Sequence, residues 1–285
     1  MIARSSLKTT VYMKYIIYIL LFFPIWVTAQ TYKYIGIENG LSNRRIFNIQ
    51  KDTQGYMWFL TNEGMDRYNG KDIKHYKLNK EASTLDAPVR LGWLYTGPQI
   101  GIWVIGKQGR VFRYEANEDD FRMVYKLPDI SETISCGYLD RNNNIWLCCK
   151  DSILLYNIND AHILQFSNIL HSNITAIEQI DEQHFFIATE LGVRYVKLEN
   201  GILETIPVKT LDYFHAQVSE LYFHKQLKRL FIGSFERGVF VYDMNTQEIM
   251  RPEADLSDVN IARISPLNET ELLIATEGMG VYKVN

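Results

Sequence analysis

GLSNRRIFNIQKDTQGYMWFLTNEGMDRY, residues 40–68, contains three short alternating segments separated by turn-forming residues. Segments 45–51, 56–61 and 65–68 have the length and the apolar–polar alternation of β-strands. Asp-Thr-Gln-Gly and Asn-Glu-Gly lie between them, and these residue types are common in tight turns. The stretch therefore predicts a small antiparallel meander, in which Gly64 supplies the positive φ of the second turn.

The same pattern recurs five more times along the chain, and each repeat ends in a tyrosine. The six tyrosines are Tyr68, Tyr114, Tyr156, Tyr195, Tyr242 and Tyr282. They are 46, 42, 39, 47 and 40 residues apart. The middle strand of each repeat carries a large apolar residue at an equivalent place: Trp58, Trp103, Trp146, Phe186, Phe231 and Ile274. A period of this length, with several short strands per unit, is typical of β-propeller blades.

A fourth, more polar strand follows the first five repeats, at residues 73–78, 121–126, 162–166, 202–206 and 248–251. The sequence thus predicts an all-β protein, a propeller of six four-stranded blades. The ring is either a closed six-bladed one or an incomplete seven-bladed one. Residues 31–37 form a further predicted strand, which we expect to complete the last blade, because an unpaired sheet edge is a liability.

The first 29 residues have the features of a signal peptide. Lys14 precedes an apolar run at 15–27, and small residues end the segment at Ala29. The predicted organisation is a signal peptide at 1–29, with translation starting at Met1 or Met13, and a propeller domain at 30–285. We therefore expect an exported, periplasmic protein.

Charge and composition exclude several classes of function. Removing the three basic residues of the signal segment takes the net charge from −3 to −6, and nucleic-acid binding needs a concentrated basic surface instead. Three cysteines without metal-ligand spacing are predicted to be buried: Cys136, Cys148 and Cys149. Three recurring aspartates are predicted to cap turns rather than to bind metal: Asp52, Asp140 and Asp181. No cofactor or metal site is expected.

Residues 40–70 resemble the first repeat of the two-component regulator propeller family. The matching motifs are Gly-Leu-Ser-Asn at 40–43, Asp-x-x-Gly at 52–55, Met-Trp-Phe-Leu-Thr at 57–61, Gly-Met at 64–65, Arg-Tyr at 67–68 and Asn-Gly at 69–70. Within this repeat, the opening residues Ser42, Asn43 and Arg44 are predicted to be free of any role in the core.

The resemblance implies the periplasmic sensor region of a Bacteroidetes hybrid two-component system. Such sensors carry two seven-bladed propellers, a β-sandwich, a membrane helix, a histidine kinase, a receiver and a DNA-binding domain. This chain ends after six repeats, which implies either a fragment of a longer sensor or a stand-alone relative. The implied ligand is an oligosaccharide derived from a glycan, and the implied partners are a second propeller or further sensor domains, with a homodimer as one expected assembly.

Two other functions are compatible with the sequence. One is a stand-alone exported propeller that serves as a binding or protein-interaction scaffold. The other, a propeller enzyme, is disfavoured because no carboxylate pair or base stands out by spacing. We expect no catalytic residues, since kinase activity would belong to domains outside this chain.

Loops that enter the inner strands of a propeller emerge on one face, where a ligand would bind. Amides, basic groups and aromatic rings suit the hydroxyls and C–H faces of a sugar. The candidates on this face are Asn43, Arg44, Arg90, Trp93, Asn173, Tyr213, His215 and Arg237. For each of them, an ordinary surface or packing role is the alternative.

Overall fold

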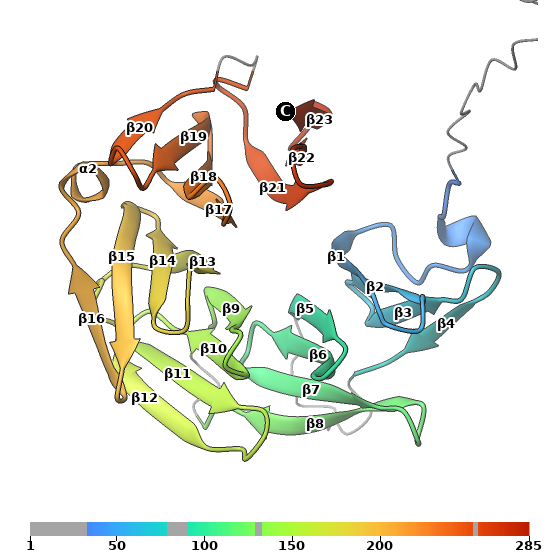
Figure 1. Ribbon diagram of the computed structural model, residues 1–285. Coiled ribbons are helices and arrows are strands. Elements are labelled where there is room, and N and C mark those ends of the chain that lie inside the picture. The colour runs from blue at the N-terminus through green and yellow to red at the C-terminus, as the bar shows by residue number, and fades with distance from the viewer. Residues whose placement is uncertain (1–32, 79–90, 129–132, 253–255, 285) are drawn as a thin grey trace, which may run out of the picture. The chain divides into compact units, whose positions relative to one another are not determined.

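The computed structural model describes residues 33–78, 91–128, 133–252 and 256–284 (Figure 1). Gly36–Asn285 forms one compact unit, separate from Met1–Ile35. The predicted signal peptide lies outside the described residues. Among those residues, no helix has the length and apolar character required to cross a membrane.

The described chain is a six-bladed β-propeller built from antiparallel sheets (Figure 1). Blade 1 consists of β1 Ile46–Lys51, β2 Met57–Thr61, β3 Met65–Tyr68 and β4 Ile73–Tyr76. Blade 2 consists of β5 Leu91–Gly97, β6 Gly101–Gly106, β7 Arg110–Glu115 and β8 Asp120–Lys126. Blade 3 consists of β9 Cys136–Leu139, β10 Asn144–Cys148, β11 Ser152–Asn157 and β12 Ile163–Ser167. Blade 4 consists of β13 Ile174–Gln179, β14 His184–Thr189, β15 Gly192–Glu199 and β16 Ile202–Ile206. Blade 5 consists of β17 Val218–His224, β18 Arg229–Ser234, β19 Gly238–Asp243 and β20 Glu248–Met250. Blade 6 consists of β21 Ile261–Pro266, β22 Leu272–Thr276 and β23 Gly280–Val284.

The predicted all-β propeller and the predicted strands are confirmed, with one exception at the last blade. Blades 1 to 5 have four strands each, but the sheet of blade 6 has three in the described chain. The prediction that residues 31–37 supply its outer strand is wrong for the described part of that segment. Residues 33–36 form no strand, and Ile37–Asn39 is a 3-10 helix, η1. Gly40, with φ 105°, ends this helix and turns the chain toward blade 1.

The middle strand of each blade carries the main core side chain. Trp58, Trp103 and Trp146 are at most 2 % exposed. Strand pairing places Phe186 and Phe231 at the same position, opposite Glu178 and Tyr222 of the inner strands. In blade 6 the equivalent residue is Leu273, not the predicted Ile274. Leu273 pairs with Ser265 of the inner strand, as Trp58 pairs with Gln50 in blade 1.

Five hydrophobic clusters hold the described blades together, and each joins two consecutive blades. One packs Trp58 of blade 1 against Leu94 and Phe112 of blade 2. The next four join blades 2 and 3, 3 and 4, 4 and 5, and 5 and 6 in the same way. Burial of this apolar surface is the main stabilising contribution to such a fold.

The outer faces of the first and last blades lack this cover. Val281 of β23 is 66 % exposed, whereas the residues at its position in blades 1 to 5 are at most 3 % exposed: Met65, Val111, Ile153, Val193 and Val239. Ile49 of β1 is 49 % exposed, whereas its equivalents Leu94, Ile177, Leu221 and Ile264 are at most 5 % exposed. Blade 6 and blade 1 therefore each present an apolar face that no described blade covers.

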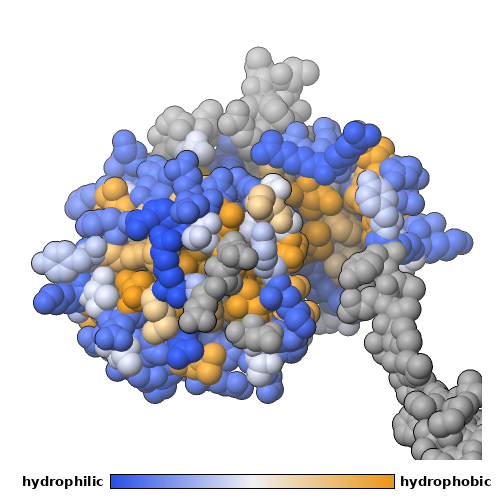
Figure 2. All heavy atoms as spheres, turned by 90° about the horizontal axis from the view of Figure 1, so that it is seen from above, coloured by the Kyte–Doolittle hydropathy of each residue, from blue (hydrophilic) through white to orange (hydrophobic). Residues whose placement is uncertain are grey.

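The remaining surface is ordinary for a folded domain. Hydrophilic side chains cover most of the face seen in Figure 2, and apolar side chains show between them. All three cysteines are buried, as predicted, and none of them forms a disulfide. Burial raises the pKa of the Cys148 thiol, so this group is an apolar packing element rather than a nucleophile.

The recurring turn aspartates have the predicted capping role. Asp140 accepts hydrogen bonds from the backbone N–H groups of Asn142 and Asn144, at 2.9 and 2.8 Å. It also accepts one from the indole N–H of Trp146, at 2.9 Å. Asp52 does the same for its own turn and for Trp58, at 2.7 Å. These aspartates thus hold both a turn and the central tryptophan of the blade.

Candidate functional site

Two sets of loops meet on one side of the propeller, which we call the loop face. One set leads into the inner strands, and the other connects the second and third strands of each blade. Backbone hydrogen bonds join the two sets in blades 4 to 6: Glu190 N–H to Asn173, Phe235 N–H to Gln217 and Glu277 N–H to Asn260. In these three blades the two sets of loops therefore lie side by side on the loop face.

Tyr213, His215 and Arg237 come together on the loop face at blades 4 and 5. Arg237 Nη1 donates a hydrogen bond to the carbonyl oxygen of His215 at 2.6 Å. His215 Nδ1 lies 3.3 Å from the carbonyl oxygen of Leu191 in blade 4. Helix α2, Lys209–Asp212, ends next to Tyr213, whose side chain is 75 % exposed. We call Leu191, Tyr213, His215 and Arg237 the loop cluster.

Packing beneath the loop cluster holds it in place. Phe214 is buried between two exposed neighbours, and its ring contacts Phe240 edge-on at 5.0 Å between centroids. The guanidinium of Arg237 lies over the same Phe240 ring, 5.3 Å from its centroid. Leu191 is 59 % exposed beside them. The cluster thus combines an exposed aromatic ring, an apolar side chain, an imidazole and a guanidinium.

The other predicted candidates are placed differently. Asn173 borders the loop cluster, where its amide donates to Glu190 Oε1 at 3.3 Å. Asn43 Oδ1 accepts from Arg45 N–H within its own turn in blade 1, and Arg44 is exposed there. Trp93 lies half-buried on β5 and packs against Gly137 of the next blade. Arg90 lies outside the described residues.

Ser42, predicted to be free of the core, is instead part of it. Its backbone N–H and its hydroxyl donate to Asp66 Oδ2, at 2.7 and 2.8 Å. The Asp66 side chain is fully buried, and its other oxygen lies 2.7 Å from His75 Nδ1. Ser42 of the opening motif therefore ties the entry loop to blade 1, while Asn43 caps its own turn.

The sequence gives no indication of a pocket that lies on the opposite side, between blades 1 and 2. It has a volume of about 460 Å³ and is lined by the first turns of both blades, with Tyr56, Arg67, Tyr114 and Asp119. The Arg67 guanidinium lies 4.9 Å from the centroid of the Tyr56 ring and donates to Tyr114 and Asp119 at 2.8 and 2.9 Å.

Asp119 joins the two blades at this pocket. It accepts from Lys74 Nζ at 2.6 Å, Tyr76 Oη at 2.8 Å and Tyr114 Oη at 2.5 Å. The hydrogen bonds from Lys74 and Tyr114 hold the pKa of this carboxyl well below its usual range. Because these donors already occupy its oxygens, Asp119 has a structural role. Arg67 lies in the Arg-Tyr motif and Tyr114 is a repeat-ending tyrosine, but nothing in the sequence singled out Lys74, Tyr76 or Asp119.

Metal binding finds no support in these sites. In the described ranges, no three His, Cys, Asp or Glu side chains are grouped closely enough to hold an ion.

Comparison with known families identifies the repeat. The model of the "Two component regulator propeller" family matches residues 40–63. Residues 40–63 are a two-component regulator propeller repeat. The resemblance seen in the sequence is thus confirmed, and the Asp-x-x-Gly, Trp and Ser-Asn elements of this regulator propeller repeat have the structural roles described above. A search of curated proteins found no match.

Extracellular domains of two putative hybrid two component systems share the fold. The extracellular domain of the putative hybrid two component system BT3049 from B. thetaiotaomicron is 20 % identical, with a TM-score of 0.69, over 89 % of this chain and 35 % of its own. The extracellular domain of the putative hybrid two component system BT4673 from the same organism is 18 % identical, with a TM-score of 0.66. The match covers 88 % of this chain and 32 % of that one. The chain thus spans about a third of the length of these structures.

The propeller fold is not restricted to sensors. A streptogramin B lyase structure is 16 % identical, with a TM-score of 0.61, over 84 % of this chain and 82 % of its own. Fold likeness alone therefore does not assign a function, which has to be argued from the repeat and from the sites.

Proposed function

We propose that this chain is the ligand-sensing propeller of a periplasmic hybrid two-component signalling system. The regulator propeller repeat at 40–63 carries the proposal. The fold likeness to the extracellular domains of two hybrid two-component systems supports it. In this proposal the chain binds a ligand and has no catalytic role, and the membrane and kinase parts of the system lie outside it.

The ligand that fits the loop cluster best is an oligosaccharide derived from a glycan. A sugar ring offers an apolar C–H face, which stacks on an exposed aromatic ring such as Tyr213. Its hydroxyls need donors and acceptors, and Arg237, Asn173 and Glu190 supply both. The packing of Phe214 and Phe240 holds these groups in place before binding, which lowers the entropic cost of recognition.

Calorimetric titration of the purified chain against a panel of glycan fragments tests the ligand class. We expect one fragment class to bind, and Tyr213→Ala to weaken its affinity by roughly threefold to tenfold, since a contact with an aromatic ring face is worth about 0.5–1.5 kcal/mol. The pocket variant Tyr56→Ala is the matched control and is expected to bind like the original chain.

Three results would contradict parts of the proposal. Loss of binding in Tyr56→Ala but not in Tyr213→Ala would move the site to the pocket between blades 1 and 2. Binding to none of the fragments would remove the oligosaccharide as ligand. Release of a cleaved product would overturn the non-catalytic role.

A second candidate, a protein-interaction scaffold, is favoured by the uncovered faces of blades 1 and 6. Apolar side chains such as Ile49 and Val281 are exposed there at positions that are buried elsewhere. Co-purification of a stoichiometric protein partner, lost in Val281→Lys and retained in Tyr213→Ala, would favour the scaffold over the sensor.

A further inference from the structure

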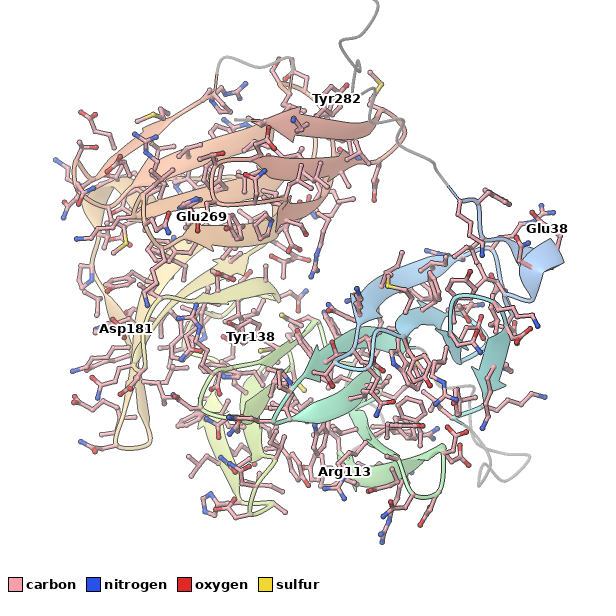
Figure 3. The ribbon with its side chains drawn as sticks, turned by 45° about the vertical axis from the view of Figure 1, so that its right-hand side comes forward. Glu38, Arg113, Tyr138, Asp181, Glu269 and Tyr282 are labelled. Carbon is pink, nitrogen blue, oxygen red and sulfur yellow. The ribbon has the colours of Figure 1, made fainter. Side chains whose placement is uncertain are left out.

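The inner strands bring polar side chains from different blades together around the centre of the propeller. One position of each inner strand lies opposite the core side chain of the middle strand. Its occupants are Gln50, Tyr95, Tyr138, Glu178, Tyr222 and Ser265. Tyr138 lies toward the middle of the blades (Figure 3). The position two residues earlier carries Glu220 in β17 and Arg263 in β21.

Three of these side chains reach across to the next blade. Tyr95 donates to the carbonyl oxygen of Gly137 at 2.8 Å, and Tyr138 accepts from Gln179 N–H at 3.1 Å. Glu178 Oε1 accepts from the N–H of Phe223, on β17, at 3.2 Å. This carboxyl group therefore links blade 4 to blade 5.

Glu220 makes the corresponding link between blades 5 and 6. Its Oε1 lies 3.5 Å from Arg263 Nη1, on β21. The Glu220 side chain is 18 % exposed, whereas that of Arg263 is 52 % exposed. A buried carboxylate thus depends on one cation that is itself partly solvated, which is a weak compensation for its lost hydration.

The two carboxyl groups also act on each other. Burial raises the pKa of Glu178 to about 7, against the opposing effects of the Phe223 N–H and Arg141, and the charge of Glu220 raises it further. Burial likewise raises the pKa of Glu220 to about 7, and Arg263 opposes the shift. Both groups ordinarily titrate near 4.5. They therefore change charge close to neutral pH.

We propose that Glu178, Glu220 and Arg263 form a proton-responsive link that joins blades 4, 5 and 6. Below neutral pH both carboxyl groups are neutral, and the inner strands pack without net charge. Above it, both carboxylates are charged in a largely buried setting, and the blade contacts that they span weaken. The titratable and charged groups that interact with them are Tyr95, Tyr138, Arg141, Tyr222 and Arg263.

The direction of the effect follows from linkage. A carboxyl group whose pKa is higher in the folded than in the unfolded chain stabilises the fold below its unfolded value. That stabilisation is lost as the pH rises through the folded value, here between about 4.5 and about 7. We expect the unfolding constant to rise by roughly tenfold per glutamate between pH 6 and pH 8. The proposal is independent of the identity of any ligand.

Chemical unfolding of the full chain, followed by circular dichroism from pH 6 to pH 8, tests the proposal. The double variant Glu178→Gln/Glu220→Gln, which mimics the protonated pair, is expected to lose this pH dependence and to exceed the original chain in stability at pH 8. Glu204→Gln, on the exposed outer strand β16, is the matched control and is expected to keep it. Histidine titration is common to all three chains and cancels in the comparison.

A second measurement covers the case in which the double variant fails to fold. Carboxyl carbon resonances of the original chain are followed by NMR between pH 4 and pH 9, and single Gln variants assign Glu178 and Glu220. Midpoints near 7 support the link. Midpoints near 4.5 for both groups, or an unchanged pH dependence in the folded double variant, would overturn it.

Discussion

At the scale of single residues, the turn aspartates show how much can be predicted from the repeat pattern. Their capping role follows from Asp at the start of each first turn. The bond to the central tryptophan was not predicted, although the six-residue spacing of Asp52 to Trp58 and of Asp140 to Trp146 was visible in the sequence. Blade 4 has Asp181 but a phenylalanine, Phe186, in the middle strand, so this bond has no counterpart there.

Asp140→Ala is expected to lower the free energy of unfolding by about 3 kcal/mol. The substitution leaves the indole N–H of Trp146 and two backbone N–H groups without an acceptor, and unsatisfied buried donors cost about 1–3 kcal/mol each. Asp181→Ala is the matched control and is expected to cost about 1 kcal/mol, because both the turn that Asp181 caps and its contact with the His184 imidazole are exposed to solvent. Urea unfolding measures both. Equal losses would contradict the role of the indole bond.

At the scale of elements, strands were predictable but their partners at the chain ends were not. Alternation and turn residues locate the strands of blade 1 and the outer strands β8, β12, β16 and β20 to within about two residues. The segment at 31–37 has a strand-like composition, yet Ile37 lies in η1, where Asn39 Oδ1 accepts from Gly36 N–H and caps the turn. Local capping by Asn and Gly therefore outweighed β-propensity.

The glycine that begins the third strand of a blade matters more for stability where another segment of the chain packs against it. Gly238, with φ 68°, begins β19, and an added Cβ would lie 1.5 Å from the carbonyl oxygen of Leu256. Gly280, with φ 86°, begins β23 in blade 6, and an added Cβ would meet nothing within 4 Å. Both have positive φ, but only Gly238 is also confined by a neighbouring backbone.

Gly238→Ala is therefore expected to destabilise the chain by more than about 3 kcal/mol, since backbone strain and a steric clash add together. Gly280→Ala is expected to cost only the strain of positive φ, about 1 kcal/mol. Circular dichroism during urea unfolding measures the difference. Similar losses in the two variants would show that the close contact with Leu256 relaxes freely.

At the scale of the whole molecule, blade number and order were predictable, while the inner polar cluster was not. Glu178 and Glu220 are 42 residues apart in the sequence, and Glu220 and Arg263 are 43 apart. No local motif therefore links them. A register shift near the start of β13, β17 and β21 also sets which residues face the centre. Alternation alone cannot locate such a bulge, so the cluster required the structure.

The uncovered face of blade 6 gives a whole-molecule prediction. Val281→Lys is expected to change stability by less than about 0.5 kcal/mol, as is usual for exposed positions. Val193→Lys, at the equivalent position in blade 4, is expected to unfold the chain, because it buries an unpaired charge. Thermal unfolding of the two variants is the measurement. A large loss in Val281→Lys would mean that this face is covered in solution.

Each hydrophobic cluster joins only two consecutive blades, and this affects the cooperativity of unfolding. Such an array behaves as a row of nearest neighbours, and its ends can separate from its middle during unfolding. Outside the predicted signal segment the tryptophans are Trp58, Trp93, Trp103 and Trp146, all within blades 1 to 3. Their fluorescence reports one half of the array, whereas circular dichroism reports both halves. A difference between the two transition midpoints would measure the cooperativity that links the blades.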